Sequence, residues 1–259
     1  PAMILSYFFA ALLVTPAMFS MVELSTAMPR AGGAYYFLDR SMGPLIGTIG
    51  EVGTWLVLVL KTAFVLIGMG AYLGLFWPEL PIAPLAVGLA LIFGLINLIG
   101  TKEAGAFQLV LVAGLLLILA WFSGLGMFQL TAGRFTSFFA EGGHAFFATA
   151  RLVYISYAGL TKITSIAEEV DDPERNLPLG MFLALATAVL AYVVGTLVMV
   201  GTVPPDALSG NLTPAAAAAE QLVGEWGIYL MTGAALLAFF AAANAGVLSA
   251  SRYPLAMSR

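Results

Sequence analysis

In two places of this 259-residue chain, side chains that could bind a solute or an ion interrupt long apolar segments. The first is Lys61, in TWLVLVLKTAFVLIGMGAYLG, and the second is the polar stretch SYAGLTK at residues 156–162. Cysteine is absent and His144 is the one histidine, so neither thiolate chemistry nor a histidine-based metal site is expected. An enzyme is not expected either, because the apolar segments hold no acidic pair to act as acid and base.

Lys61 lies near the middle of its predicted helix, about 14 Å from Val52 at about 1.5 Å per residue. A charge at that depth in lipid is unfavourable, so the side chain should face the protein interior and have a partner there. Two interpretations remain open. Lys61 is either satisfied by nearby carbonyl groups, or it replaces a bound cation or carries protons, and we favour the functional interpretation.

Residues 156–161 predict an interruption in a membrane-crossing helix. Gly159 relaxes the limits on the backbone, and small neighbours leave main-chain groups accessible. In lipid, non-helical backbone is tolerated only where it lines a cavity enclosed by protein. The half-helix ends there can bind charged groups, a carboxylate at an N-terminus and a cation at a C-terminus. The alternative is an unbroken helix whose small residues pack against a neighbour.

The composition predicts an all-α polytopic membrane protein. Hydrophobic residues make up 61% of the chain and charged residues 9%, against about 25% charged in a typical soluble domain. A transmembrane helix needs about 20 mostly apolar residues. Seven such spans are predicted, near residues 2–26, 46–76, 82–100, 105–129, 145–168, 178–202 and 226–250. We interpret residues 1–259 as a single transmembrane domain, incomplete at both ends, from a longer transporter-like chain.

Basic residues predict the orientation of the spans. Six of them fall in one set of connections and two in the other: Arg30, Arg40, Lys102, Arg175, Arg252 and Arg259 against Arg134 and Arg151. The positive-inside rule places the first set in the cytoplasm, residue 1 near the outer face and residue 259 inside. The run of alanines at 215–219 predicts a short helix on the outer side. The glycines of GPLIGTIGEVG, 43–53, favour close helix packing over a phosphate loop.

Three motifs resemble the amino acid–polyamine–organocation (APC) superfamily of permeases. ELSTAMPRAGGAYYFLDRSMGP, with Glu23 and Arg30, resembles the second helix and the loop after it. AEEVDDPERNLPLGM, with Glu168 and Glu169, resembles the loop between helices six and seven, and NAGVLSASRYPLAMSR, with Asn244, resembles the end of helix eight. The resemblance implies that the seven spans are helices two to eight of a five-plus-five inverted-repeat fold. In that fold, helices one and six are broken at the substrate site.

The resemblance also implies which residues bind substrate. The unwound part of helix six corresponds to Ser156, Tyr157, Ala158, Gly159, Leu160 and Thr161. Its backbone carbonyls would receive the α-ammonium group of the substrate, and Tyr157 and Leu160 would shape the pocket for its side chain. The carboxylate would bind helix one of the family, which this chain lacks. Some proton-coupled members use a lysine in helix five, where this chain has none. Lys61, in helix three, would then serve the coupling role from a different position, or would serve another purpose.

Further candidates belong to the inner gate or to ion coupling. Lys162 either pairs with Glu168 or Glu169 or lines the pathway. Glu23 is interpreted as an interfacial cap or a gate charge, and Arg30 lies in the loop that contributes to the inner gate in the family. Asn244 is expected to form an interhelical hydrogen bond, with ion coordination as the alternative.

The predicted function is secondary active transport of amino acids across the cytoplasmic membrane, by alternating access. The expected partners are a small-molecule substrate, a proton or alternatively sodium, and the lipid bilayer; no cofactor and no nucleic acid is expected. Transport of a polyamine or another organic amine is one alternative. Another is a non-transporting sensor or scaffold on the permease fold. A channel is disfavoured, because one polar interruption does not make a ring of like residues.

Overall fold

The computed structural model describes residues 1–28, 34–99, 101–136, 138–139, 142–157, 159–160, 163–164, 167 and 170–257. Across these residues the regular structure is helical throughout, without strands. Five helices are long and apolar enough to cross a membrane: Ala2–Ala27, Pro44–Gly70, Gly105–Met127, Pro173–Thr202 and Glu225–Ser251. A shorter apolar helix covers Ile82–Leu98. The prediction of an all-α polytopic membrane protein is therefore confirmed, whereas the count of seven spans stays a prediction.

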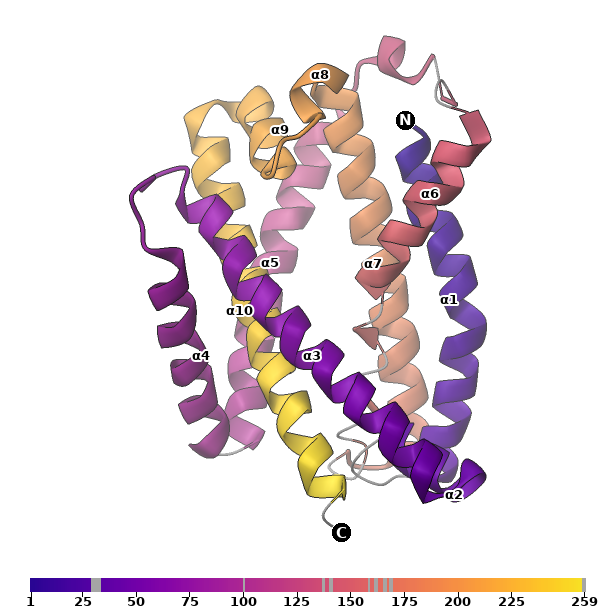
Figure 1. Ribbon diagram of the computed structural model, residues 1–259. Coiled ribbons are helices and arrows are strands. Elements are labelled where there is room, and N and C mark those ends of the chain that lie inside the picture. The colour runs from indigo at the N-terminus through magenta and orange to yellow at the C-terminus, as the bar shows by residue number, and fades with distance from the viewer. Residues whose placement is uncertain are drawn as a thin grey trace. The chain divides into compact units, whose positions relative to one another are not determined.

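Six long helices follow the predicted spans closely (Figure 1). They are α1 (Ala2–Ala27), α3 (Pro44–Leu73), α4 (Ile82–Ile99), α5 (Thr101–Met127), α7 (Pro173–Thr202) and α10 (Glu225–Met257). Each contains a long run of apolar residues. In lipid, the backbone N–H and C=O groups of such a run can find hydrogen-bond partners only within the segment itself, as in a helix. Their ends fall within a few residues of the prediction, except that α7 begins five residues earlier and α10 ends seven residues later.

Short helices fill the connections. They are α2 (Ala34–Met42), η1 (Ala132–Phe135), η2 (Ile155–Tyr157), α8 (Pro205–Leu208) and α9 (Pro214–Val223). The last of these confirms the short helix predicted from the run of alanines. Proline opens both α8 and α9, where its fixed φ suits the first turn and its missing N–H is not needed.

The predicted span 145–168 differs from the structure. The α-helix there, α6 (Gly142–Tyr154), is 13 residues long and gives way to the 3-10 turn η2. Beyond it, the described residues up to Asp172 are not α-helical. The regular α-helix thus ends two residues before the predicted interruption at 156–161, and the predicted span to residue 168 stays a prediction.

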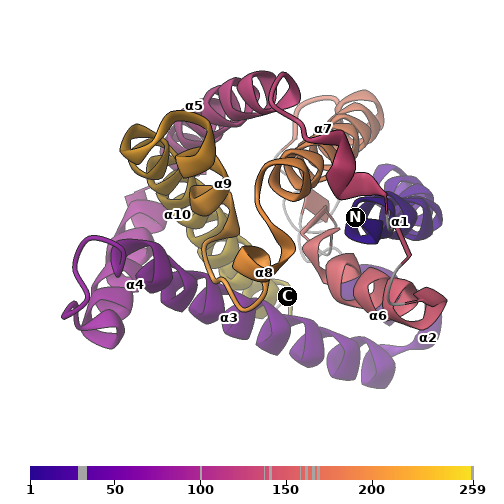
Figure 2. The same cartoon turned by 90° about the horizontal axis from the view of Figure 1, so that it is seen from above.

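The chain divides into two compact units. The first comprises residues 1–57, 137–194 and 249–259. Within it, α1 packs along α6, as Figures 1 and 2 both show. Helix α7 runs antiparallel to α1, because Phe19 contacts Phe182 near one end and Tyr7 contacts Tyr192 near the other. Their shared core is formed by small and branched side chains: Ala10, Ala11, Val14, Met18, Val153, Tyr157, Met181 and Leu185.

The second unit comprises residues 58–136 and 195–248. One core cluster joins α5, α9 and the adjoining ends of α7 and α10, and it contains Phe122, Val198, Val203, Ala216, Ala218, Ala219 and Met231. A second cluster joins α3, α4 and α10 through Leu66, Phe93 and Ala243. Glycines permit the closest approaches: a Cβ at Gly227 would lie 2.1 Å from the carbonyl oxygen of Ala219.

Candidate functional site

The interruption at the end of α6 is the feature around which the site is built. The α-helix stops at Tyr154, and Ile155–Tyr157 continue as a 3-10 turn. The change of helix type alters which carbonyls are bonded, because 3-10 bonds join residues three apart and α-helical bonds join residues four apart. The structure thus confirms that regular helix ends where the polar stretch begins. Ala158 and Thr161, two of the predicted substrate residues, lie outside the described residues.

Three tyrosines from three elements hold the interrupted segment. The ring of Tyr192, on α7, lies 5.3 Å from the ring of Tyr7, on α1, and 5.3 Å from the ring of Tyr157, on η2. The hydroxyl of Tyr157 donates to the backbone carbonyl of Tyr7 at 3.1 Å. The hydroxyl of Tyr192 donates to the backbone carbonyl of Ser156 at 3.4 Å. Lipid offers no hydrogen-bond partner to a tyrosine hydroxyl or a backbone carbonyl, and these two bonds supply one to each.

The described residues of the segment differ in their exposure. Ser156 is exposed, whereas Tyr157 is 1% exposed and belongs to the core cluster of the first unit. Gly159 and Leu160 are half-buried, and Leu160 packs against the same cluster. A carbonyl oxygen has two lone pairs. The carbonyl of Ser156 can therefore accept a second hydrogen bond besides that from Tyr192.

Tyr192 lies well inside a helix that is long and apolar enough to cross a membrane. Tyr192 is about 29 Å from the start of α7 and about 15 Å from its end, at about 1.5 Å per residue. Both α1 and α7 are long and apolar enough to span a membrane. The tyrosines Tyr7 and Tyr192 were not singled out from the sequence. Each lies in an apolar run, SYFFAALL and AVLAYVVG respectively. A buried tyrosine hydroxyl usually has a hydrogen-bond partner, so a tyrosine in such a run could have indicated a polar contact there.

Asn244 forms part of a polar contact within the second unit. Its side-chain carbonyl accepts from the amide of Asn97, on α4, at 2.9 Å. Its amide donates to Gln108, on α5, at 3.1 Å. Asn244 is 1% exposed, so these bonds satisfy a group that water does not reach. The expected interhelical hydrogen bond is confirmed, and ion coordination by Asn244 stays a prediction.

Two of the remaining predicted site residues, Lys61 and Glu23, are described by the structure. Lys61 is half-buried on α3, and within the described chain the structure records no hydrogen bond or ion pair for it. Glu23 is exposed near the end of α1, where its backbone carbonyl accepts from Thr26. The gate residues Arg30, Lys162, Glu168 and Glu169 lie outside the described residues. The described residues contain no group of three or more histidine, cysteine or acidic side chains able to hold a metal ion.

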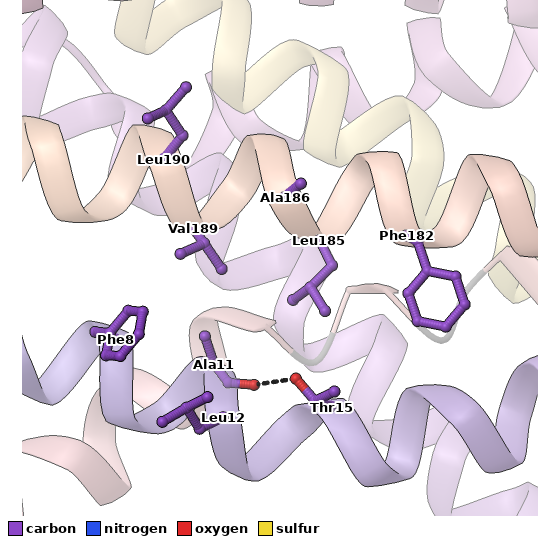
Figure 3. A pocket seen from close by; sticks show the side chains of 9 residues that line it. All are labelled: Phe8, Ala11, Leu12, Thr15, Phe182, Leu185, Ala186, Val189 and Leu190. Atoms are coloured by element: carbon purple, nitrogen blue, oxygen red, sulfur yellow. Dashed lines mark hydrogen bonds between the residues drawn. The ribbon is translucent and has the colours of Figure 1, made fainter.

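A groove of about 440 Å³ lies between α1 and α7, and none of the predicted substrate residues lines it. Figure 3 shows its lining, which is Phe8, Ala11, Leu12, Thr15, Phe182, Leu185, Ala186, Val189 and Leu190. Its single hydroxyl, that of Thr15, donates to the carbonyl of Ala11 at 2.9 Å in the same helix. The groove suits hydrocarbon chains and offers no group that would bind a charged or zwitterionic solute.

Comparison with known proteins matches the whole chain to one family. The family model for amino acid permeases matches residues 1–259. The chain is 28% identical over 288 residues to the vacuolar cationic amino acid transporter 4 of Arabidopsis thaliana, with 100% of this chain and 47% of the relative covered. It is 26% identical over 223 residues to the methylthioribose transporter of Bacillus subtilis (strain 168), with 79% and 48% covered. The chain spans about half the length of these relatives.

Proposed function

Because the chain belongs to the amino acid permease family, we propose that it serves secondary active transport of an amino acid or a related amine. The observation that carries this proposal is the end of α6 at Tyr154, followed by the non-α-helical and exposed Ser156. Interrupted helices mark substrate sites in secondary transporters, since they present unpaired backbone groups within the membrane. Transport would occur by alternating access across the cytoplasmic membrane, with residue 1 near the outer face and residue 259 inside.

The proposed substrate segment is Ser156–Thr161, with Ala158 and Thr161 included on the sequence prediction. An ammonium group carries hydrogen-bond donors and no acceptor. The carbonyl of Ser156 would supply an acceptor, and Ser156 as a residue is exposed. Tyr192, which already donates to that carbonyl, fixes its direction. Leu160 offers an apolar surface for the side chain of the substrate.

The proposed coupling site is Lys61. It is half-buried in α3 and has no recorded partner among the described residues. An unpaired intramembrane lysine is a functional candidate, either as a fixed positive charge or as a group that binds and releases a proton. Proton symport is therefore the proposed mode, and sodium coupling with Asn244 as a ligand is the alternative. Glu23, Arg30, Lys162, Glu168 and Glu169 would form the inner gate.

The substrate class is proposed as amine-bearing. One relative is named for cationic amino acids and another for methylthioribose, a sugar derivative without an amine. Members of this similarity group therefore differ in what they carry. The carbonyl acceptor at Ser156 favours the amine, because a carbonyl accepts hydrogen bonds from an ammonium group and cannot donate any.

Uptake by the full-length protein in proteoliposomes tests the proposal. The panel would contain labelled lysine, arginine, leucine, putrescine and methylthioribose, each with and without an inward proton gradient. Selective uptake of an amine, increased by the gradient, is expected. Absence of uptake for the whole panel by folded protein would contradict transport of an amine and favour a sensor or scaffold. Uptake of methylthioribose alone would contradict the role of Ser156 as an ammonium acceptor.

Two substitutions at one position test the coupling role. Lys61→Arg keeps the positive charge but cannot release a proton, because arginine stays protonated. If Lys61 carries protons, Lys61→Arg and Lys61→Ala both lose stimulation by the gradient. If Lys61 is a fixed charge, Lys61→Arg keeps the stimulation and Lys61→Ala loses it. Full gradient dependence in Lys61→Ala would exclude both roles.

A further inference from the structure

Glu51 is a glutamate on α3 whose carboxyl group is buried. It lies on α3, in the range Pro44–Gly70 that is long and apolar enough to cross a membrane. Its side chain is 0% exposed, and both carboxyl oxygens lack a hydrogen-bond partner in the structure. Among the described residues it is the one acidic or basic side chain that is buried.

Glycines account for the burial. Gly50 and Glu51 follow Gly47 by three and four residues, so both lie on the side of α3 that Gly47 occupies. A Cβ at Gly47 would lie 2.9 Å from the Cα of Asp39, and one at Gly50 would lie 2.7 Å from Cδ1 of Leu38. Helix α2 therefore packs directly on this face. Side chains on a helix lean toward the preceding turn, which for Glu51 is the turn of Gly47.

Among the described residues, no charged side chain is recorded as a partner of the Glu51 carboxyl. Helix α2, which packs on this face, carries Tyr36 and Asp39, both half-buried, and Arg40, which is exposed. None of them hydrogen-bonds to Glu51. The other described acidic, basic and histidine side chains of this unit are exposed: Glu23, His144, Arg151, Asp171, Asp172, Glu174 and Arg175. Its further described tyrosines are Tyr7 and Tyr192, which are half-buried, Tyr157, which is buried, and Tyr154, which is exposed. The remaining charged or titratable side chains of the unit lie outside the description: Arg30, Tyr35, Glu141, Lys162, Glu168, Glu169, Arg252, Tyr253 and Arg259.

A proton is the ligand that fits these observations. An unpaired carboxylate out of water is strongly unfavourable, and a metal cation would need several further oxygen ligands. A proton removes the charge without adding volume. We propose that Glu51 is a proton-binding site, protonated while α2 covers this face and releasing its proton to cytoplasmic water when the face opens. On release, the O–H bond of the carboxyl breaks, the proton passes to water and the carboxylate becomes hydrated.

The proposal deepens the proposed transport function, and it rests on that function only for the direction of proton movement. It adds a second titrating group to Lys61, nearer the cytoplasmic end of the same helix. Glu51 would then bind or release the proton at the inner face, whereas Lys61 would bind or release one near the midplane.

The first test reads the proton itself. In infrared difference spectra of the purified full-length protein between acidic and alkaline solution, a protonated carboxyl gives a C=O stretching band that a carboxylate lacks. We expect Glu51→Gln to remove one such band, because glutamine has the same shape and cannot ionise. Glu79→Gln, which replaces an exposed carboxyl in the loop between α3 and α4, should leave that band unchanged. An identical band in wild type and Glu51→Gln would overturn the proposal.

The second test reads transport by the same variants in proteoliposomes. Glu51→Gln should lose stimulation by an inward proton gradient, falling to the uptake seen without a gradient, while substrate counterflow persists. Glu51→Asp should keep part of the stimulation. Loss of counterflow for cationic but not neutral amino acids would show that Glu51 binds the substrate, and would overturn the proposal. If wild type shows no uptake, the transport function fails, and the infrared band still decides whether Glu51 binds a proton.

Discussion

The amide contact between Asn97 and Asn244 gives a prediction whose size follows from the structure. Asn244 makes interhelical hydrogen bonds of 2.9 Å to Asn97 and 3.1 Å to Gln108. Such bonds in membrane proteins contribute about 0.6 kcal/mol on average and up to about 1.7 kcal/mol. Asn244→Ala should therefore lower the free energy of unfolding by about 1–3 kcal/mol. A double-mutant cycle with Asn97→Ala should show a coupling free energy of about 0.6–1.7 kcal/mol.

The assay is unfolding of the full-length protein in detergent by increasing SDS, followed by tryptophan fluorescence. Gln221→Ala, which removes an exposed amide from α9, is the matched control and should change the unfolding free energy by less than about 0.5 kcal/mol. A coupling near zero would refute an energetic role for the Asn97–Asn244 bond. Stabilisation of the wild type by sodium that disappears in Asn244→Ala would instead favour ion coordination.

Two further predictions concern packing and the tyrosine contact. Gly227→Ala should lower the unfolding free energy by about 3 kcal/mol or more, because the new Cβ would lie 2.1 Å from the backbone oxygen of Ala219. Gly233→Ala, which meets nothing within 4 Å, should be neutral or stabilising in the same SDS titration. Tyr157→Phe removes the 3.1 Å bond to the carbonyl of Tyr7 and should cost about 0.5–1.5 kcal/mol in that assay. No measurable change would mean that this bond does not hold the segment.

The long helices could be predicted because apolar length is a local property of the sequence. A run of about 20 apolar residues has few alternatives to helix in lipid. The short helix α9 followed from the helix propensity of its alanines. The interpretation of the glycines of residues 43–53 as packing residues is confirmed for Gly47 and Gly50, which lie against α2, but not for Gly43 and Gly53, near which nothing lies within 4 Å of a Cβ.

Features that depend on several segments could not be predicted. Helix α6 ends at Tyr154, next to a segment whose hydrogen bonds reach residues distant in sequence. The hydroxyl of Tyr157 donates to the carbonyl of Tyr7 on α1, and the carbonyl of Ser156 accepts from Tyr192 on α7. The partners of Asn244 likewise come from α4 and α5. The burial of Glu51 depends on the turn that brings α2 back onto α3. A contact of this kind between two helices produces no periodic pattern of residues from which it could be predicted.

Substrate protection of a single cysteine at Ser156 tests most directly whether the interrupted segment binds substrate. This chain has no cysteine, so Ser156→Cys in a cysteine-free full-length protein gives one thiol at an exposed position of the segment. Ser41→Cys, exposed on α2, is the matched control. A transported amine should slow modification of Ser156→Cys by a soluble maleimide several-fold and leave Ser41→Cys unchanged. Equal rates with and without the amine at Ser156→Cys would contradict a substrate site at the end of α6.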